Sequence, residues 1–258
     1  MAAIAISETS LGSLKRALSV NFVDEKSSHL TEALAFALGF QTNAALLAAV
    51  AQNSDDPPIV LLHTDRFVER LESFGYPRDE EFDFEFLAGK SSPAISTVPA
   101  TAFEYKYNTE RKKAWRNLMV CAINEGIRQK LFSVRPGDNR WPGSISGVPE
   151  VRDMRHGDNG HIFDFSLPNG LPALGYVDDT GWSELSVHVA VNPTGDWVRT
   201  ATAGFEAGDA FATSWLERER GAWLQSSEQL TCRKFLLGTL AALDVEPLGY
   251  GDRAAVLI

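Results

Sequence analysis

Apolar side chains recur at every third or fourth position near the start of the chain, which is the spacing of a helix that packs through one face. The first such stripe consists of Leu11, Leu14, Leu18 and Phe22. A second helix is expected over residues 27–38, because Ser27 or Ser28 can cap its start and Gly39 can take the left-handed conformation that ends it. These two segments predict that the chain begins with helices.

A third helix is expected over residues 43–52, with Thr42 as its cap. The stretch that follows, residues 53–58, has the sequence Asn-Ser-Asp-Asp-Pro-Pro and is both polar and stiff. A stretch of this kind is typical of a linker between domains. We therefore predict a helical unit over residues 1–53 and a separate body over residues 59–258.

Short apolar runs, alternating with polar residues or continuous, predict the strands of the body. They lie at 59–63, 162–167, 171–177, 184–191, 197–203 and 246–258. Phe82, Phe84 and Phe86 alternate with acidic residues and predict one more strand, buried on one face. Because only a few residues separate the four strands between 162 and 203, we expect antiparallel neighbours there.

Helical spacing returns in four segments of the body, 65–74, 109–131, 209–224 and 227–243. Strands and helices do not alternate regularly, and neither GxGxxG nor GxxxxGK[ST] occurs, which argues against a nucleotide-binding fold. We predict an α+β fold, in which a small N-terminal helical unit is joined to a mainly antiparallel sheet with flanking helices.

The charge balance limits the partners that the chain can bind. Its 258 residues include 24 Lys and Arg against 34 Asp and Glu, so the net charge is −10. A field of that sign repels nucleic acids and anionic membranes unless a local basic patch offsets it. The chain has only two cysteines, no evident leader and no apolar run of membrane-spanning length, so we expect a cytoplasmic protein.

One local basic patch is present, between Arg111 and Arg140. Three of its cations fall in the first turn of the expected helix over 109–131, where the helix dipole already presents positive charge and an anion would be favourable. Trp141 follows directly and could stack on a base or a sugar. The residues expected to contact an anion or a nucleic acid are Arg111, Lys112, Lys113, Arg116, Arg135, Arg140 and Trp141. In the alternative interpretation the cations pair with carboxylates of the acidic body or are solvated, and Trp141 fills the core.

A second candidate is a cluster of histidines and carboxylates between residues 153 and 164. His156, Asp158 and His161 are the expected ligands of a divalent metal, with Asp153 and Asp164 nearby. No other cofactor is expected. The spacing matches no named metal motif, so a plain surface turn and a metal-free acid–base site remain alternatives.

Within residues 11–50, Ser28-His29, Gly39-Phe40 and Leu46 resemble the short N-terminal helical module of glyoxalase-related bacterial proteins. The resemblance implies a bacterial accessory protein and no catalytic residue. The same region also has the outline of a helix-turn-helix, but only Gln41, Thr42 and Asn43 could contact bases, so a packing bundle is the alternative.

Three functions are consistent with these features. The first is an accessory protein that binds a macromolecular partner, protein or nucleic acid, without catalysis of its own, through the helical unit and the basic segment. The second is a metal-assisted hydrolase or related enzyme centred on residues 153–164. The third is a structural scaffold subunit.

Overall fold

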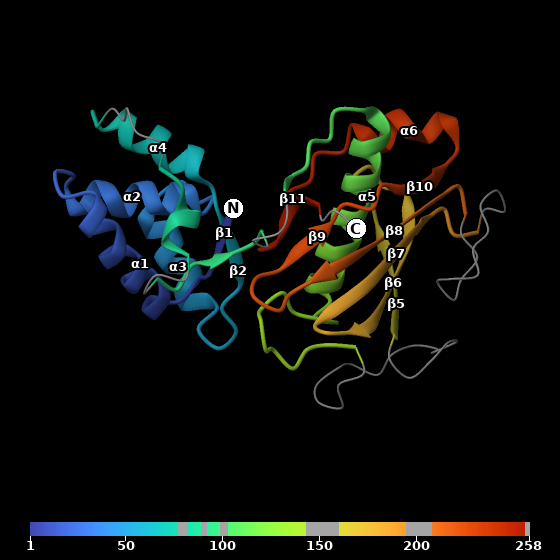
Figure 1. Ribbon diagram of the computed structural model, residues 1–258, viewed down its shortest axis with the longest axis horizontal. Helices are drawn as coiled ribbons and strands as arrows, with labels where there is room; N and C mark the ends of the chain where they lie inside the picture. Colours follow the sequence, from blue (N-terminus) through green and yellow to red (C-terminus); the bar gives the residue numbers. More distant parts are fainter. Residues whose placement is uncertain (77–81, 89–91, 99–102, 143–159, 195–207, 256–258) are drawn as a thin grey trace. The chain divides into compact units, whose positions relative to one another are not determined.

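The computed structural model describes residues 1–76, 82–88, 92–98, 103–142, 160–194 and 208–255 (Figure 1). The chain forms two compact units. Unit 1 comprises Met1–Val98 together with Gly249–Gly251, and unit 2 comprises Pro99–Leu248 with Asp252–Ile258. No helix in the described residues is long and apolar enough to cross a membrane.

Unit 1 combines a small antiparallel sheet with a set of helices. The sheet has the order β2-β1-β3, with bounds Ile59–Leu62, Ala2–Ala5 and Ile95–Ser96. The helices are α1 (Glu8–Asn21), α2 (Ser27–Ala37), α3 (Asn43–Gln52), α4 (Thr64–Ser73) and the 3₁₀ helix η1 (Phe84–Leu87). The α+β class and the three helices predicted within residues 11–52 are confirmed, but the prediction of a purely helical unit is wrong, because β1 precedes the helices and pairs with β2 and β3.

Local capping explains where these helices begin and end. The Thr42 hydroxyl accepts the Ala45 amide at 3.2 Å, so Thr42 caps α3 as predicted. Gly39 has φ of +84° and ends α2 in the left-handed conformation, also as predicted. The N-cap of α2 is Lys26, and no side chain caps that end, so neither predicted serine serves as its cap.

Unit 1 extends well beyond residue 53, where the sequence suggested a boundary. Its single core draws side chains from Ala2 to Ala94, and the helices contribute to it together with β1, β2 and η1. The Ile6 amide donates to the Pro58 carbonyl at 2.9 Å. Residues 53–58 therefore form an exposed loop inside one unit, because the apolar faces of α1–α3 are covered by elements on both sides of that loop.

The phenylalanine-rich segment is a 3₁₀ helix, so the predicted strand at Phe82, Phe84 and Phe86 is wrong. The Asp83 carboxylate accepts the Glu85 amide at 2.9 Å and caps the start of η1. In a 3₁₀ helix residues three apart share a side. Phe84 is buried, while Phe86 points outward.

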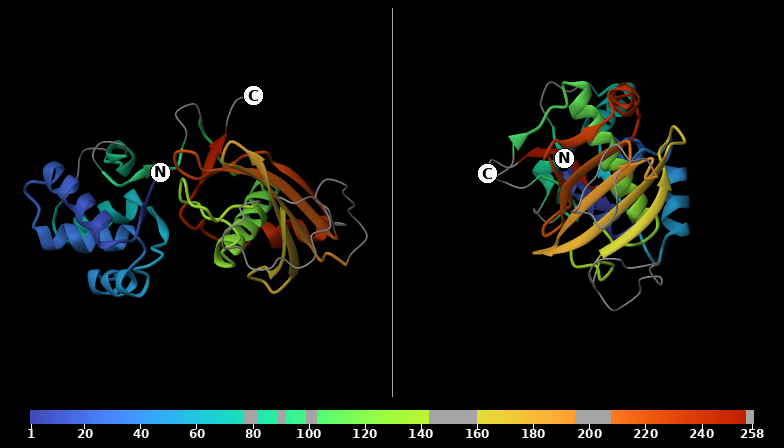
Figure 2. Two further views of the ribbon diagram at one scale, coloured as in Figure 1. Left: turned by 90° about the horizontal axis from the view of Figure 1, so that it is seen from below. Right: turned by 90° about the vertical axis from the view of Figure 1, so that its right-hand side faces the viewer.

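Unit 2 is a mainly antiparallel sheet with one long helix across a face. The sheet has the order β4-β11-β9-β8-β7-β6-β5, and β10 pairs with β8. The strand bounds are Phe103–Glu104 (β4), Gly160–Ser166 (β5), Pro172–Gly181 (β6), Glu184–Val191 (β7), Ala210–Glu217 (β8), Trp223–Gln225 (β9), Gln229–Cys232 (β10) and Gly251–Ala255 (β11). Helix α5 (Glu110–Arg128) lies against the sheet, and α6 (Lys234–Ala241) packs on α5 (Figure 2). The predicted meander and the long helix are confirmed for the described strands; the strand predicted at 197–203 lies outside the described residues.

The helix predicted over 209–224 is wrong. This segment forms β8 and β9, and burial alternates along β8 with a period of two: even-numbered positions from Ala210 to Leu216 are fully buried and odd-numbered ones are half-exposed. The helix predicted over 227–243 is wrong in its first part, where β10 pairs with β8 before α6 begins. Residues 210–217 form a strand because they pair with β7 on one side and with β10 on the other.

Candidate functional site

Helix α1 carries two stripes of side chains at helical spacing. The first, Leu11, Leu14 and Leu18, is buried in the core of unit 1. The second is made of smaller and more polar residues and is at least partly exposed. Its members are Ser13, Arg16, Ala17, Val20 and Asn21. Since core packing uses only the first stripe, the second is left facing solvent along the helix.

The segment that leads into η1 faces this second stripe. Phe82 packs edge-on against Phe22 of the core, with ring centroids 5.0 Å apart, and also touches Phe67 and Phe84. Leu87 packs against the same core from the last position of η1. The core therefore holds the two apolar residues of this wall in place.

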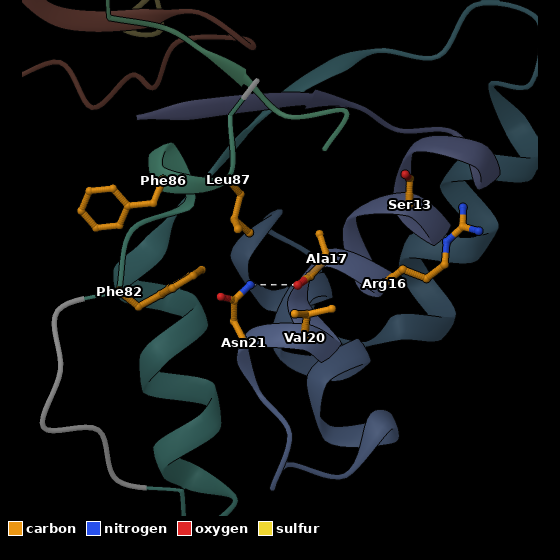
Figure 3. A pocket seen from close by; sticks show the side chains of 8 residues that line it. All are labelled: Ser13, Arg16, Ala17, Val20, Asn21, Phe82, Phe86 and Leu87. Atoms are coloured by element: carbon orange, nitrogen blue, oxygen red, sulfur yellow. Dashed lines mark hydrogen bonds between the residues drawn. The ribbon is translucent and has the colours of Figure 1, made fainter. Parts of the chain in front are cut away.

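A groove of about 680 Å³ lies between the two walls and is open to solvent. Figure 3 shows Ala17, Val20 and Asn21 on one side, facing Leu87 and Phe82 on the other. The Asn21 side-chain amide donates to the Ala17 carbonyl at 2.9 Å, so the Asn21 side chain folds back along α1. The surface that remains in the groove is predominantly apolar.

The rim of the groove exposes large apolar side chains to water. Val20 is 76% exposed and Phe86 is 63% exposed. Exposed apolar groups that cluster beside a hollow are typical of binding sites. Binding at the groove would therefore bury apolar surface that unit 1 exposes to water.

Among the described residues that line the groove, Arg16 is the one charged side chain, and no ion pair with another described residue engages it. Residues 1–98 otherwise carry an acidic excess, with seven Lys and Arg against fourteen Asp and Glu. Arg16 therefore offers a local positive contact on an acidic unit, and it can pair with a carboxylate of a bound segment.

Two of the three basic residues in the first turn of α5 contact internal partners. The Arg111 guanidinium donates to the Leu230 carbonyl. Lys112 lies 3.3 Å from the Glu228 carboxylate and 4.7 Å from the centre of the Tyr105 ring. Lys113 is exposed and has no partner among the described residues.

Arg116 forms a largely buried ion pair. Its Nε lies 2.6 Å from Asp252 Oδ2, and the Asp252 side chain is only 3% exposed. The same guanidinium donates to the Val245 carbonyl at 2.5 Å and to the Asn117 side chain at 3.0 Å. These contacts agree with the alternative interpretation of the basic segment, in which its cations pair inside the protein.

The second half of the basic segment is also occupied by internal contacts. Arg140 and Asp138 form an ion pair with a 2.7 Å contact, and the hydrogen bonds from Arg140 hold the pKa of Asp138 far below its usual range. The Arg218 guanidinium lies 3.7 Å from the centre of the Trp141 ring and donates to the carbonyls of Ser133, Arg135 and Asp138. Trp141 is buried, so it fills the core instead of presenting a stacking surface.

The expected metal cluster is described only in part. His156 and Asp158 lie outside the described residues. His161 lies at the start of β5, is 5% exposed and has no hydrogen-bond partner among the described residues, and burial lowers its pKa. Within the described residues no group of three metal-ligating side chains gathers. The metal site stays a prediction.

The helix-turn-helix outline is used for packing where it is described. Leu46 and Val50 of α3 are buried in the core of unit 1. At the start of the helix, the Thr42 hydroxyl serves as the cap and the Asn43 amide donates to Glu32 Oε2 at 3.1 Å. The backbone at the start of α3 is therefore satisfied from within unit 1.

The sequence did not predict the groove, because the residues that line it do not differ in type from those of other exposed helix faces. Ser13, Ala17 and Val20 do recur at helical spacing, and this second stripe on α1 was the available signal. Its apposition to Phe82 and Leu87 depends on the fold. The chain matches no protein-family model, no curated protein and no solved structure.

Proposed function

We propose that this protein binds a partner protein, and that the groove of unit 1 receives an amphipathic helix of that partner. The observation that carries the proposal is the open apolar groove, with Val20 and Phe86 exposed on its rim. Helix-in-groove recognition uses apolar anchors at positions i, i+3 or i+4, and i+7 of the bound helix, laid along a hydrophobic groove.

The shape of the groove favours a macromolecular occupant over a small molecule. Small-molecule sites enclose most of the surface of their ligand. Here the apolar surface continues onto the rim at Val20 and Phe86, where only a larger partner would cover it. A carboxylate on the bound helix beside Arg16 would fix its direction and register.

Nucleic acid fits this site less well than protein. Residues 1–98 carry twice as many acidic as basic side chains. In unit 2, Lys112, Arg116 and Arg140 each pair with a carboxylate of the protein itself. Both facts reduce the electrostatic attraction on which phosphate backbones depend. The metal-assisted enzyme remains an untested alternative, since two of its three ligands lie outside the described residues.

The proposal can be tested with a phage-displayed library of 16-residue peptides selected on the full chain. The affinity of a selected, fluorescein-labelled peptide is then measured by anisotropy against Ala17→Trp, which fills the groove. Ser19→Trp is the matched control, because Ser19 is exposed on the same helix and does not line the groove. We expect a loss of affinity of at least tenfold for Ala17→Trp and less than twofold for Ser19→Trp.

Circular dichroism of both variants checks that α1 remains helical. The proposal fails if selection enriches no peptide over a blank surface, or if both tryptophan variants bind the peptide as the unmodified chain does. It also fails if the enriched peptides lack apolar residues at helical spacing.

A further inference from the structure

The turn between β6 and β7 has an unusual residue at its tip. Gly181 pairs with Glu184, so Trp182 and Ser183 alone connect the two strands. Their φ angles are +57° and +59°, which is the type I′ geometry. This geometry strongly favours Asn-Gly, and a bulky side chain with positive φ is a genuine outlier. Turn formation therefore does not explain the presence of a tryptophan here.

Packing does not explain it either. Trp182 is 96% exposed, the largest exposed fraction of any large apolar side chain among the described residues. Trp115, Trp141 and Trp223 are all buried. Trp182 therefore lies in water, at a backbone position that disfavours it.

Hydrogen bonds hold the turn in a fixed conformation. The Arg218 amide donates to the Ser183 carbonyl at 3.0 Å, which ties the tip to the end of β8. The Gly181 amide donates to Asp179 Oδ1 at 2.9 Å, and the Thr180 hydroxyl donates to the Glu184 carbonyl at 3.0 Å. Binding at the tip would therefore order the indole side chain but not the backbone of the turn, which is already fixed, and this lowers the entropy cost.

The surroundings of the tip are acidic. Glu184 lies directly opposite Glu217 in the sheet, and Glu219 is close enough to influence the Glu217 carboxyl. Burial and the neighbouring Glu184 raise the pKa of Glu217. Among the described residues no ion pair engages any of these three glutamates, and Arg220 is the exposed cation of this region.

The remaining arginine of this region is directed elsewhere. The Arg218 guanidinium is bonded to the carbonyls of Ser133, Arg135 and Asp138. Like charges directly opposite one another on adjacent strands are destabilising. The Gln225 side-chain amide donates to Glu184 Oε2 at 3.0 Å, and Trp223 and Arg220 partly offset the effect of Glu184 on Glu217. A further cation between the two carboxylates would relieve the remaining repulsion.

We propose that the β6–β7 turn is a second interaction surface, at which Trp182 and the flanking glutamates bind a basic segment of a protein partner. A Lys or Arg side chain would lie over the indole ring in a cation–π contact, for which tryptophan is the best aromatic partner. Neighbouring cations of the same segment would pair with Glu184 and Glu217. A hairpin tip is convex, so it suits a chain laid across it and not a small ligand enclosed in a pocket.

A fluorescein-labelled nona-arginine peptide tests this inference by anisotropy on the full chain, with a nona-glutamate peptide as the charge control. The decisive variant is Trp182→Asn, because asparagine tolerates positive φ and the fold should melt at the same or a higher temperature. Phe235→Asn is the matched control, since Phe235 is another exposed aromatic residue, on α6. We expect at least a fivefold loss of affinity for Trp182→Asn, less than twofold for Phe235→Asn, and retention within about threefold for Trp182→Tyr.

The inference is overturned if Trp182→Asn binds nona-arginine as tightly as the unmodified chain, or if Phe235→Asn weakens binding equally. It is also overturned if vesicles of phosphatidylcholine and phosphatidylserine bind in a Trp182-dependent way, since the turn would then be a membrane contact. The surface does not depend on the groove of unit 1: Ala17→Trp should leave nona-arginine binding unchanged, so the two proposals can fail separately.

Discussion

Replacing Arg116 with methionine tests whether the basic segment is structural. The change removes the closer cation of Asp252, whose side chain is 3% exposed, together with the donors to the Val245 carbonyl and the Asn117 side chain. The Nε of Arg253, a largely exposed side chain, remains 3.9 Å from Asp252 Oδ1. Removing one partner of a buried ion pair typically costs about 3–5 kcal/mol. We expect Arg116→Met to lower the free energy of unfolding of unit 2 by that amount.

The assay is urea unfolding followed by tryptophan fluorescence. All six tryptophans of the chain belong to unit 2, so the signal reports on that unit without a contribution from unit 1. Lys113→Met is the control: Lys113 is exposed on the same helix, and its replacement should change stability by less than about 0.5 kcal/mol. Adding Asp252→Asn to Arg116→Met should recover about 1 kcal/mol or more, because the orphaned charge is then gone.

A loss below about 1 kcal/mol for Arg116→Met would refute this reasoning. The ion pair would then be dispensable, and Arg116 would again be a candidate for anion binding. The same conclusion would follow if Asp252→Asn made the double variant less stable than Arg116→Met alone.

Three further predictions follow from particular contacts. Proteolytic cleavage within residues 53–58 should leave the two fragments of unit 1 associated on gel filtration, since one core joins them; release of a free 1–53 fragment would contradict this. Gly126→Ala should lower the stability of unit 2 by about 1–3 kcal/mol in the same urea assay, because a Cβ at this position would lie 2.3 Å from the Phe132 ring. Gly12 lies on α1 with open space around it, so Gly12→Ala should raise the stability of unit 1 by about 0.5–1 kcal/mol, measured by circular dichroism. Burial lowers the pKa of His188 to about 4, so between pH 6.5 and 4 this histidine is protonated in the unfolded chain but not in the folded one. The free energy of unfolding should therefore fall by about 3 kcal/mol as the pH decreases across this range, and His188→Gln should reduce that pH dependence.

Much of the secondary structure could be predicted because its cause is local. The stripe over residues 109–131 suits only a helix, and the cap at Thr42 and the stop at Gly39 each follow from the chemistry of one residue. The three described strands of the meander were found for the same reason, since short turns leave adjacent strands little choice but to pair. These features determined the α+β class.

The errors concern segments whose pattern suits more than one structure. Residues 210–217 mix small, aromatic and polar side chains, and their pairing with β7 and β10 makes them a strand. Phe82, Phe84 and Phe86 suit a strand equally well, but the cap from Asp83 and the burial of Phe84 make a 3₁₀ helix. Distant strands decide the outcome at residues 210–217, whereas at η1 a local cap acts together with the burial of Phe84.

The candidate sites show the same division. The sequence identified which residues are cationic, but the partner of Arg116 lies 136 positions away, so only the tertiary structure could show that this charge is paired internally. The groove consists of ordinary residues of α1 that become a surface only when Phe82 and Leu87 pack opposite them. Local propensity fixes where helices and turns form, whereas burial and pairing, which depend on contacts between distant parts of the chain, fix which side chains remain available for binding.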